Sequence, residues 1–339
     1  MEQGRDEMDE MNFGSKDARG NWSPKKPIDY GPVFVWPPKP KAFLKWFFAF
    51  PGYLFPWNVL YALAAIGIWY CLTPPLVHFQ TFGLFWFGVI LGRNIFLALL
   101  VYGSWHIWLY VWRKQGTRFK YNRNWPEEKA ERFTFNNQTY DNIFWTLVSG
   151  VPIWTCYEVL LLWSCANGYV TMITPYENPV MFIALFFLVP FVHEVGFYFA
   201  HRSLHFPWLF RIAHYLHHRN NNPGPWSGLS MHPIEHIIYF SSALIFFIVP
   251  AHPIHIINLL SRLGLAPAQG HTGFDRVATG DDASVDTSYY AHYLHHKYFE
   301  VNYADGMVPL DKWFGSFHDG TAEAHEAMKH RRRKRGIRG

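Results

Sequence analysis

The chain has 339 residues, of which 50% are hydrophobic, 19% aromatic and only 16% charged, whereas soluble globular chains average about 25% charged residues. This composition argues against an ordinary soluble domain and is typical of a protein that lies partly in lipid, with aromatic side chains at the bilayer interfaces. The formal charge of +5 is too small to indicate a partner. The three cysteines have no CxxC spacing, so neither a disulfide framework nor a cysteine-type zinc site is indicated.

The N-terminal segment differs from the rest of the chain in its polarity. Residues 1–30 contain no apolar core of a signal peptide, and a proline-rich stretch follows at residues 32–40. We expect a disordered tail, because so polar a segment has few side chains to bury. The predicted divisions are a polar tail at 1–40, membrane-anchor helices at 41–178, a catalytic domain at 179–318 and a basic tail at 319–339.

Four apolar runs each approach or exceed the ~20 residues with which a helix spans a bilayer: 53–72, 81–112, 143–165 and 180–200. A fifth run, residues 237–260, carries two prolines and two histidines near its middle. Because such a polar centre needs protein or water around it, this run is interpreted as a bent span or a re-entrant hairpin. The predicted fold is an all-α integral membrane bundle of about four spans plus a kinked or re-entrant fifth, with a histidine-rich cytosolic helical cap.

The positions of lysine and arginine predict which helix ends face the cytosol. Seven of these residues lie between positions 113 and 132, after the second run, whereas the loop between the third and fourth runs has none. We therefore expect the histidine motifs and both termini in the cytosol, on a bacterial inner membrane or the endoplasmic reticulum. The basic run at 331–335 is interpreted as a contact with anionic lipid, since no nucleic-acid-binding motif accompanies it.

Fourteen of the nineteen histidines lie between His193 and His296. They include an HxxxH at 201–205, an HxxHH at 214–218 and a second HxxHH at 292–296. Residues three and four apart share a helix face, so each motif directs two or three imidazoles the same way. Neutral imidazole binds iron, zinc, copper and nickel. Eight such ligands exceed the four of a tetrahedral zinc ion, so the pattern predicts two metal ions side by side rather than purely structural histidines.

Several residues outside these motifs are weaker candidates. His232 precedes a proline and is expected just before a helix, where it either reaches the metal site or remains outside it. His271 lies in a loop between glycines, which allows close approach to a metal ion. His236 and Asp275 are further candidates for completing the site.

Glu194 lies on the same helical stripe as His201 and His205, deeper in the fourth apolar run. We expect it either to accept a hydrogen bond from a ligating imidazole or to make a polar packing contact between helices. The pair His193-Glu194 is not the start of a metalloprotease HExxH, because Phe197 occupies the second histidine position.

The order of these motifs resembles that of the fatty acid hydroxylase/sterol desaturase superfamily of integral membrane oxidases. The resemblance covers residues 182–317, and also includes His232-Pro-Ile-Glu235 and Gly270-His-Thr-Gly273. It implies a helical membrane anchor below a cytosolic cap that holds a di-iron centre. The implied metal ligands are His201, His205, His214, His217, His218, His271, His292, His295 and His296, with His232 nearby. Some members carry another histidine near Asp275, and this chain has none there.

The resemblance also implies a reaction, namely O2-dependent hydroxylation or desaturation of a sterol or fatty-acyl C–H bond in lipid biosynthesis. Its cofactor would be two iron ions, with zinc as a substitute in purified protein. No haem- or flavin-binding segment is recognisable, so we expect an external electron donor, either a b-type cytochrome or a ferredoxin with an NAD(P)H reductase. The alternatives are a zinc-dependent membrane hydrolase and a non-enzymatic metal-binding membrane protein, which metal analysis would separate because zinc is redox-inert.

Overall fold

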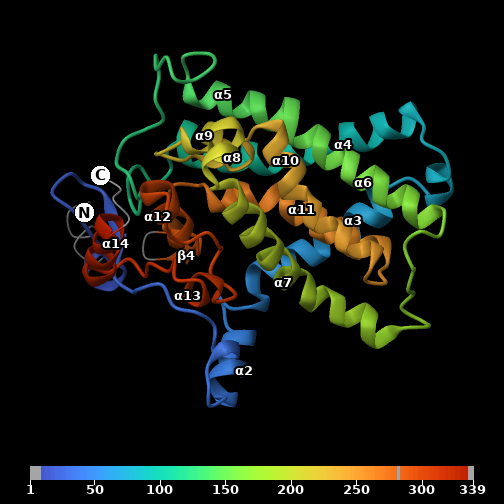
Figure 1. Cartoon of the computed structure of the whole chain (residues 1–339), viewed down its shortest axis with the longest axis horizontal. Helices are drawn as coiled ribbons and strands as arrows, with labels where there is room; N and C mark the ends of the chain where they lie inside the picture. The colour runs from blue at the N-terminus through green and yellow to red at the C-terminus, as the bar shows by residue number, and fades with distance from the viewer. Residues whose placement is uncertain (1–8, 281–282, 335–339) are drawn as a thin grey trace.

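The computed structural model describes residues 9–280 and 283–334 of the chain, and these residues are mostly helical (Figure 1). Within them, four helical segments are long and apolar enough to cross a membrane: Leu54–Leu72, Leu84–Val111, Gln138–Ala166 and Pro179–Leu204. They contain α3 (Val59–Leu72), α4 (Leu84–His106), α5 (Gln138–Trp145), α6 (Val151–Ala166) and α7 (Pro179–Leu204). The expected all-α membrane bundle is thereby confirmed, whereas the domain boundaries stay a prediction.

The outer surface of this bundle is apolar, as lipid contact requires. Leu63, Phe85, Phe96 and Ile183, one on each of α3 and α7 and two on α4, are all more than half exposed. Exposed apolar patches of this extent are rare on soluble monomers. The protein is therefore an integral membrane protein.

The fifth apolar run folds as a helical hairpin, one of the two forms expected for it. α10 (Pro233–Phe240) continues as a 3-10 segment to Phe247, and α11 (Pro253–Gly270) returns through the bundle. The turn reaches the end of the bundle opposite the histidine motifs, since Ala251 pairs with Met172 in the loop between α6 and α7.

α11 forms the centre of the bundle, in contact with α3, α4, α6 and α7 (Figure 1). Gly264 permits this packing, because a Cβ atom there would lie 2.6 Å from the ring of Trp154. The hydroxyl of Tyr102 donates to the carbonyl of Gly264 at 2.8 Å, which fixes α4 against α11. This helix therefore carries His271, at its C-terminal end, on a rigid support.

A buried ion pair joins α4 to α6 within the membrane spans. Arg93 Nη2 lies 2.5 Å from Glu158 Oε1, and Asn94 donates to the other carboxylate oxygen at 3.1 Å. Both charged side chains are almost fully buried, so each would be left uncompensated without the other.

We expect Glu158→Ala to destabilise the protein by about 3–5 kcal/mol, because it leaves the Arg93 guanidinium unpaired in the interior. The thermal unfolding midpoint in detergent would measure this loss. The double substitution Arg93→Leu/Glu158→Leu, which removes both charges, is the control and should recover most of the stability. A Glu158→Ala protein as stable as the parent would show that the pair does not hold the spans together.

Residues 9–40 are not the disordered tail that their composition predicts, and residues 1–8 lie outside the described residues. β1 (Gly14–Lys16) pairs with β2 (Trp22–Pro24), and α2 (Pro40–Phe48) follows. Trp22 is buried, and its Nε1–H donates to Asp275 Oδ2 at 3.0 Å. The large apolar ring of Trp22 anchors the segment by its burial, although the segment is polar on average.

The cap that surrounds the histidine motifs is built from short elements at one end of the bundle. α8 (Pro207–Leu209), a helical turn and α9 (Tyr215–His218) follow α7 directly. The second half of the cap contains β3 (Arg276–Ala278), β4 (Ser284–Asp286), α12 (Tyr290–Tyr298) and α13 (Leu310–Trp313). α14 (Ala322–Lys334) lies beyond α12, at the far end of the cap from the spans (Figure 1). The predicted basic tail is thus helical over most of its length.

Candidate metal centre

Nine histidines converge in two adjacent groups. Within each group one nitrogen per ring can be chosen so that all lie within 4.8 Å of one another. The first group consists of His201, His205, His214, His218 and His295, and the second of His217, His271, His292 and His296. The groups are in contact, since the ring centroids of His218 and His296 are 5.1 Å apart. The structure therefore brings together nine of the ten histidines predicted from the sequence.

The two HxxHH motifs contribute to both groups in opposite proportions. The motif of α9 gives His214 and His218 to the first group and His217 to the second. The motif of α12 gives one histidine, His295, to the first group and the remaining two to the second. With 3.6 residues per turn, position i+4 is offset from i by about 40° in one sense and i+3 by about 60° in the other, so the two point about 100° apart. Each motif can therefore bridge two neighbouring metal ions.

Backbone carbonyls fix the orientation of several of these rings. The Nδ1–H groups of His201, His271 and His295 donate to the carbonyls of Tyr303, Pro267 and Val301 at 2.8, 2.9 and 2.7 Å. In the first group His214 Nδ1 lies 2.6 Å from Glu235 Oε1. Because Nδ1 carries the proton in this arrangement, Nε2 presents a lone pair to the group.

The Nε2 atoms are packed closely enough to share a proton or a metal ion. Those of His214 and His218 are 3.0 Å apart, those of His218 and His295 are 3.1 Å apart, and those of His271 and His292 are 3.0 Å apart. Lone pairs at this distance in a dry interior repel one another unless a proton or a metal ion lies between them. All-imidazole donor sets suit iron, zinc, copper or nickel, and five donors exceed tetrahedral zinc. The residues present therefore fit a metal pair.

Burial keeps the imidazoles in the form that binds metal. It lowers the pKa of His205 to about 2 and the pKa of His217 to about 4. The pKa of His295 lies well below its ordinary value for the same reason. All three rings are consequently neutral near pH 7, which leaves the ring nitrogens free to act as ligands.

Comparison with known proteins agrees with this geometry. Residues 186–316, which include all nine converging histidines, match the family model described as fatty acid hydroxylase. Over these residues the chain is similar to the fatty acid hydroxylase/sterol desaturase superfamily. No solved structure matches it.

Several curated sterol desaturases are similar to the chain. The Delta(7)-sterol 5(6)-desaturase ERG3 of Saccharomyces cerevisiae is 28% identical over 50% of this chain and 47% of its own length. The putative Delta(7)-sterol-C5(6)-desaturase 2 of Arabidopsis thaliana is 25% identical over 76% of this chain and 86% of its own. The erg3C desaturase of Aspergillus fumigatus is 28% identical over 42% and 52%. The chain thus spans about half the length of the yeast and Aspergillus relatives.

Three of the weaker candidates lie outside both groups, although they fall within the residues that match the family model. His232 caps α10, where its Nδ1 accepts from the Ile234 N–H at 3.2 Å. His236 bonds to a serine hydroxyl and a backbone carbonyl, and Asp275 accepts from Trp22 and Tyr121. Because proline occupies the first helical position of α10, His232 lies at the N-cap. Glu235, three residues further along the same motif, contacts His214 instead.

Asp305 is a residue of the site that no sequence motif identified. Its Oδ1 lies 3.8 Å from His292 Nδ1, which has no hydrogen-bond partner among the described residues. Glu194 holds this loop in place, because its Oε1 accepts from the N–H groups of Gly306 and Met307 at 2.9 and 3.0 Å. The predicted role of Glu194 as direct partner of an imidazole is thus replaced by a contact through the 305–308 loop.

We expect Asp305→Asn to weaken metal binding by the second group by up to about tenfold, because the carboxylate no longer orients and polarises His292. Competition with a chelator would measure the affinity of the more weakly held ion. Asp29→Asn, which changes an exposed carboxylate of the N-terminal segment, is the matched control. Equal losses from both groups, or none from either, would contradict a specific role for Asp305.

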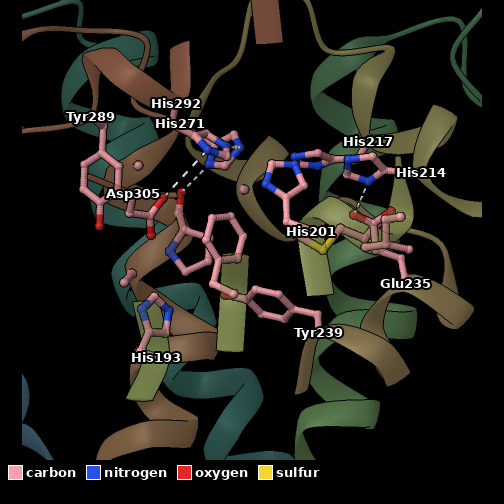
Figure 2. A pocket seen from close by; sticks show the side chains of 17 residues that line it. His193, His201, His214, His217, Glu235, Tyr239, His271, Tyr289, His292 and Asp305 are labelled. Carbon is pink, nitrogen blue, oxygen red and sulfur yellow. Dashed lines mark hydrogen bonds and ion pairs between the residues drawn. The ribbon is translucent and has the colours of Figure 1, made fainter. Parts of the chain in front are cut away.

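An apolar pocket lies directly beside both groups (Figure 2). Histidines of the first and second groups form its upper wall, and Phe197, Leu204, Met231 and Ala266 contribute apolar surface. Apolar walls with a few polar groups are typical of ligand sites. The pocket thus places apolar surface next to the two histidine groups.

Proposed function

We propose that the protein is a membrane-bound di-iron oxidoreductase that uses O2 to hydroxylate or desaturate a lipid. The observation that carries this proposal is the juxtaposition of two all-histidine groups with an apolar cavity inside a membrane bundle. A lipid could reach such a cavity from the bilayer without crossing water. The similarity to fatty acid hydroxylases and to curated sterol desaturases supports the same reaction class.

The two groups would each hold one iron ion, through five histidines in the first and four in the second. Iron bound there would supply the redox chemistry that activates O2, which redox-inert zinc does not. The chain itself performs three tasks. Backbone carbonyls and Glu235 keep the ring nitrogens aimed at the centre, the helices exclude water, and the walls of the cavity orient the lipid C–H bond toward the metal groups.

A sterol is the first substrate class to test, because the similar curated proteins act on Δ7-sterols according to their names. Hydroxylation and desaturation share the initial attack on a C–H bond and differ in the step that follows. The placement of the substrate carbon at the metal groups therefore decides between the two products.

We also propose that the histidine groups and both ends of the chain face the cytosol. The basic loop after the second span lies beside the cap, where Arg118 pairs with Asp9 and Lys120 pairs with Phe274 in a β-bridge. The same end of the molecule carries α12 and α14 (Figure 1). Electrons would come from an external donor on this side, either a b-type cytochrome or a ferredoxin with an NAD(P)H reductase.

Expression in a yeast strain that lacks its own Δ7-sterol 5(6)-desaturase would test the proposal. Lipid mass spectrometry should find sterols two mass units lighter, or lipids sixteen units heavier, only when the protein is expressed. The same chain bearing His217→Ala is the negative control. An unchanged lipid profile with inserted, iron-loaded protein and a competent electron donor would overturn the proposed activity.

A further inference from the structure

The helical segment that follows α7 has an apolar outer face. Residues 207–218 are helical without a break, as α8, a helical turn and α9. Trp208, Ile212 and Tyr215 fall at i, i+4 and i+7, and each is more than half exposed. His214 and His218 of the first histidine group lie on the buried face of the same segment. The pattern is therefore the reverse of a water-facing helix, whose outer face would be polar.

The apolar face continues the lipid-facing surface of a membrane span. On α7, Leu188, Val195 and Phe199 recur at i, i+7 and i+11, so they form one stripe, and all three are exposed. Phe206, which is also exposed, connects the end of α7 to residues 207–218. α8 and α9 lie where the cap adjoins the spans, whereas α14 lies at its far end (Figure 1). The lipid that surrounds α7 can therefore extend over the outer face of this segment.

The charges of the segment suit a surface that carries phosphates. Residues 206–222 include Arg211 and Arg219 but no aspartate or glutamate. Arg219 pairs with Asp141 at 3.1 Å, whereas Arg211 is exposed and donates to the carbonyl of Pro207. Tryptophan and tyrosine are enriched at the level of the lipid headgroups, and basic side chains are attracted to anionic headgroups. A helix with an apolar face and basic residues beside it is the kind that lies in a membrane interface.

We propose that the outer face of residues 207–218 lies in the headgroup layer of the membrane, with Trp208, Ile212 and Tyr215 in contact with lipid. A single helix, about 10 Å in diameter, then separates the first histidine group from the lipid. His205, the member of that group that is only partly buried, contacts Phe210 of this segment, with ring centroids 5.4 Å apart. Lipid rather than water thus covers this side of the histidine groups. The inference rests on the membrane location of the spans and not on the proposed reaction.

Spin labels on single cysteines test this placement in the full chain, in nanodiscs of phosphatidylcholine and phosphatidylserine. The three native cysteines are first replaced by serine. Labels at Trp208→Cys and Ile212→Cys should collide with oxygen, which dissolves preferentially in lipid, and should lose access to a water-soluble nickel chelate. Phe96→Cys, at an exposed position of the span α4, is the lipid-facing control and should behave in the same way. Ala327→Cys, at an exposed position of α14, should show the reverse.

Monodisperse elution of each labelled protein in size-exclusion chromatography shows that it remains folded. Access of the nickel chelate to either label at the level found for Ala327→Cys would overturn the inference, because water would then cover the face. Shielding of both labels from both reagents would also overturn it, because a second copy or another protein would then cover the face. Neither result depends on turnover, so a failure of the proposed function is distinguishable from a failure of this placement.

Discussion

Substitution of His295 by alanine is expected to reduce lipid oxidation to background while membrane insertion continues. His295 belongs to the first group, and its Nδ1–H is held by the carbonyl of Val301 at 2.7 Å. Loss of a ligand should cost more than the roughly 10- to 100-fold that loss of a hydrogen-bond partner to a ligand costs. His217→Ala should have the same effect through the second group, because oxidation needs both ions.

Product formed per unit of membrane-inserted protein measures this effect. His236→Ala is the matched control, because it also removes a buried imidazole but leaves both groups complete. The control should lose stability and retain turnover in the protein that folds. Substantial activity in both His295→Ala and His217→Ala would show that the two groups are not the catalytic centre.

Replacement of Glu235 by leucine is expected to weaken metal binding by the first group by about 10- to 100-fold. Glu235 is buried, and its Oε1 is the only described partner of His214 Nδ1, at 2.6 Å. Without this acceptor the ring is free to rotate or to carry its proton on Nε2, where the ligand lone pair is needed. Glu235→Gln retains an acceptor of the same size and should lose less.

Chelator competition on the purified variants measures the loss. His232→Ala is the informative comparison within the same motif, because His232 caps α10 and lies outside both groups. It should leave the metal affinity unchanged. Equal losses for Glu235→Leu and His232→Ala would return His232 to the set of ligands and would contradict the placement described above.

The local part of the site could be predicted from the sequence. Spacings of three and four residues place imidazoles on shared helix faces wherever the segment is helical, as it is at 201–205, 214–218 and 292–296. Helix geometry separates i+3 from i+4 in each HxxHH motif, but the group that each of them joins was not predictable, because it depends on how α9 and α12 face each other. Asp305 was missed for a similar reason, since Glu194, more than 100 residues earlier, holds its loop.

The membrane helices were predictable because lipid imposes length and apolarity on every span. Residues 9–40 were not, because average polarity conceals single anchoring contacts. Trp22 is one such contact, and its partner Asp275 lies 253 residues away in the chain. The fifth apolar run was predictable only in part. Its prolines predicted a break in the helix, but not whether the chain bends or reverses there.

We expect the two histidine groups to hold two metal ions side by side. Elemental analysis of protein purified from iron-supplied cells measures this, with wild type, His295→Ala and His217→Ala compared in one experiment. We expect close to two iron atoms per wild-type chain and close to one in each variant. A single metal ion per wild-type chain, or two in both variants, would contradict it.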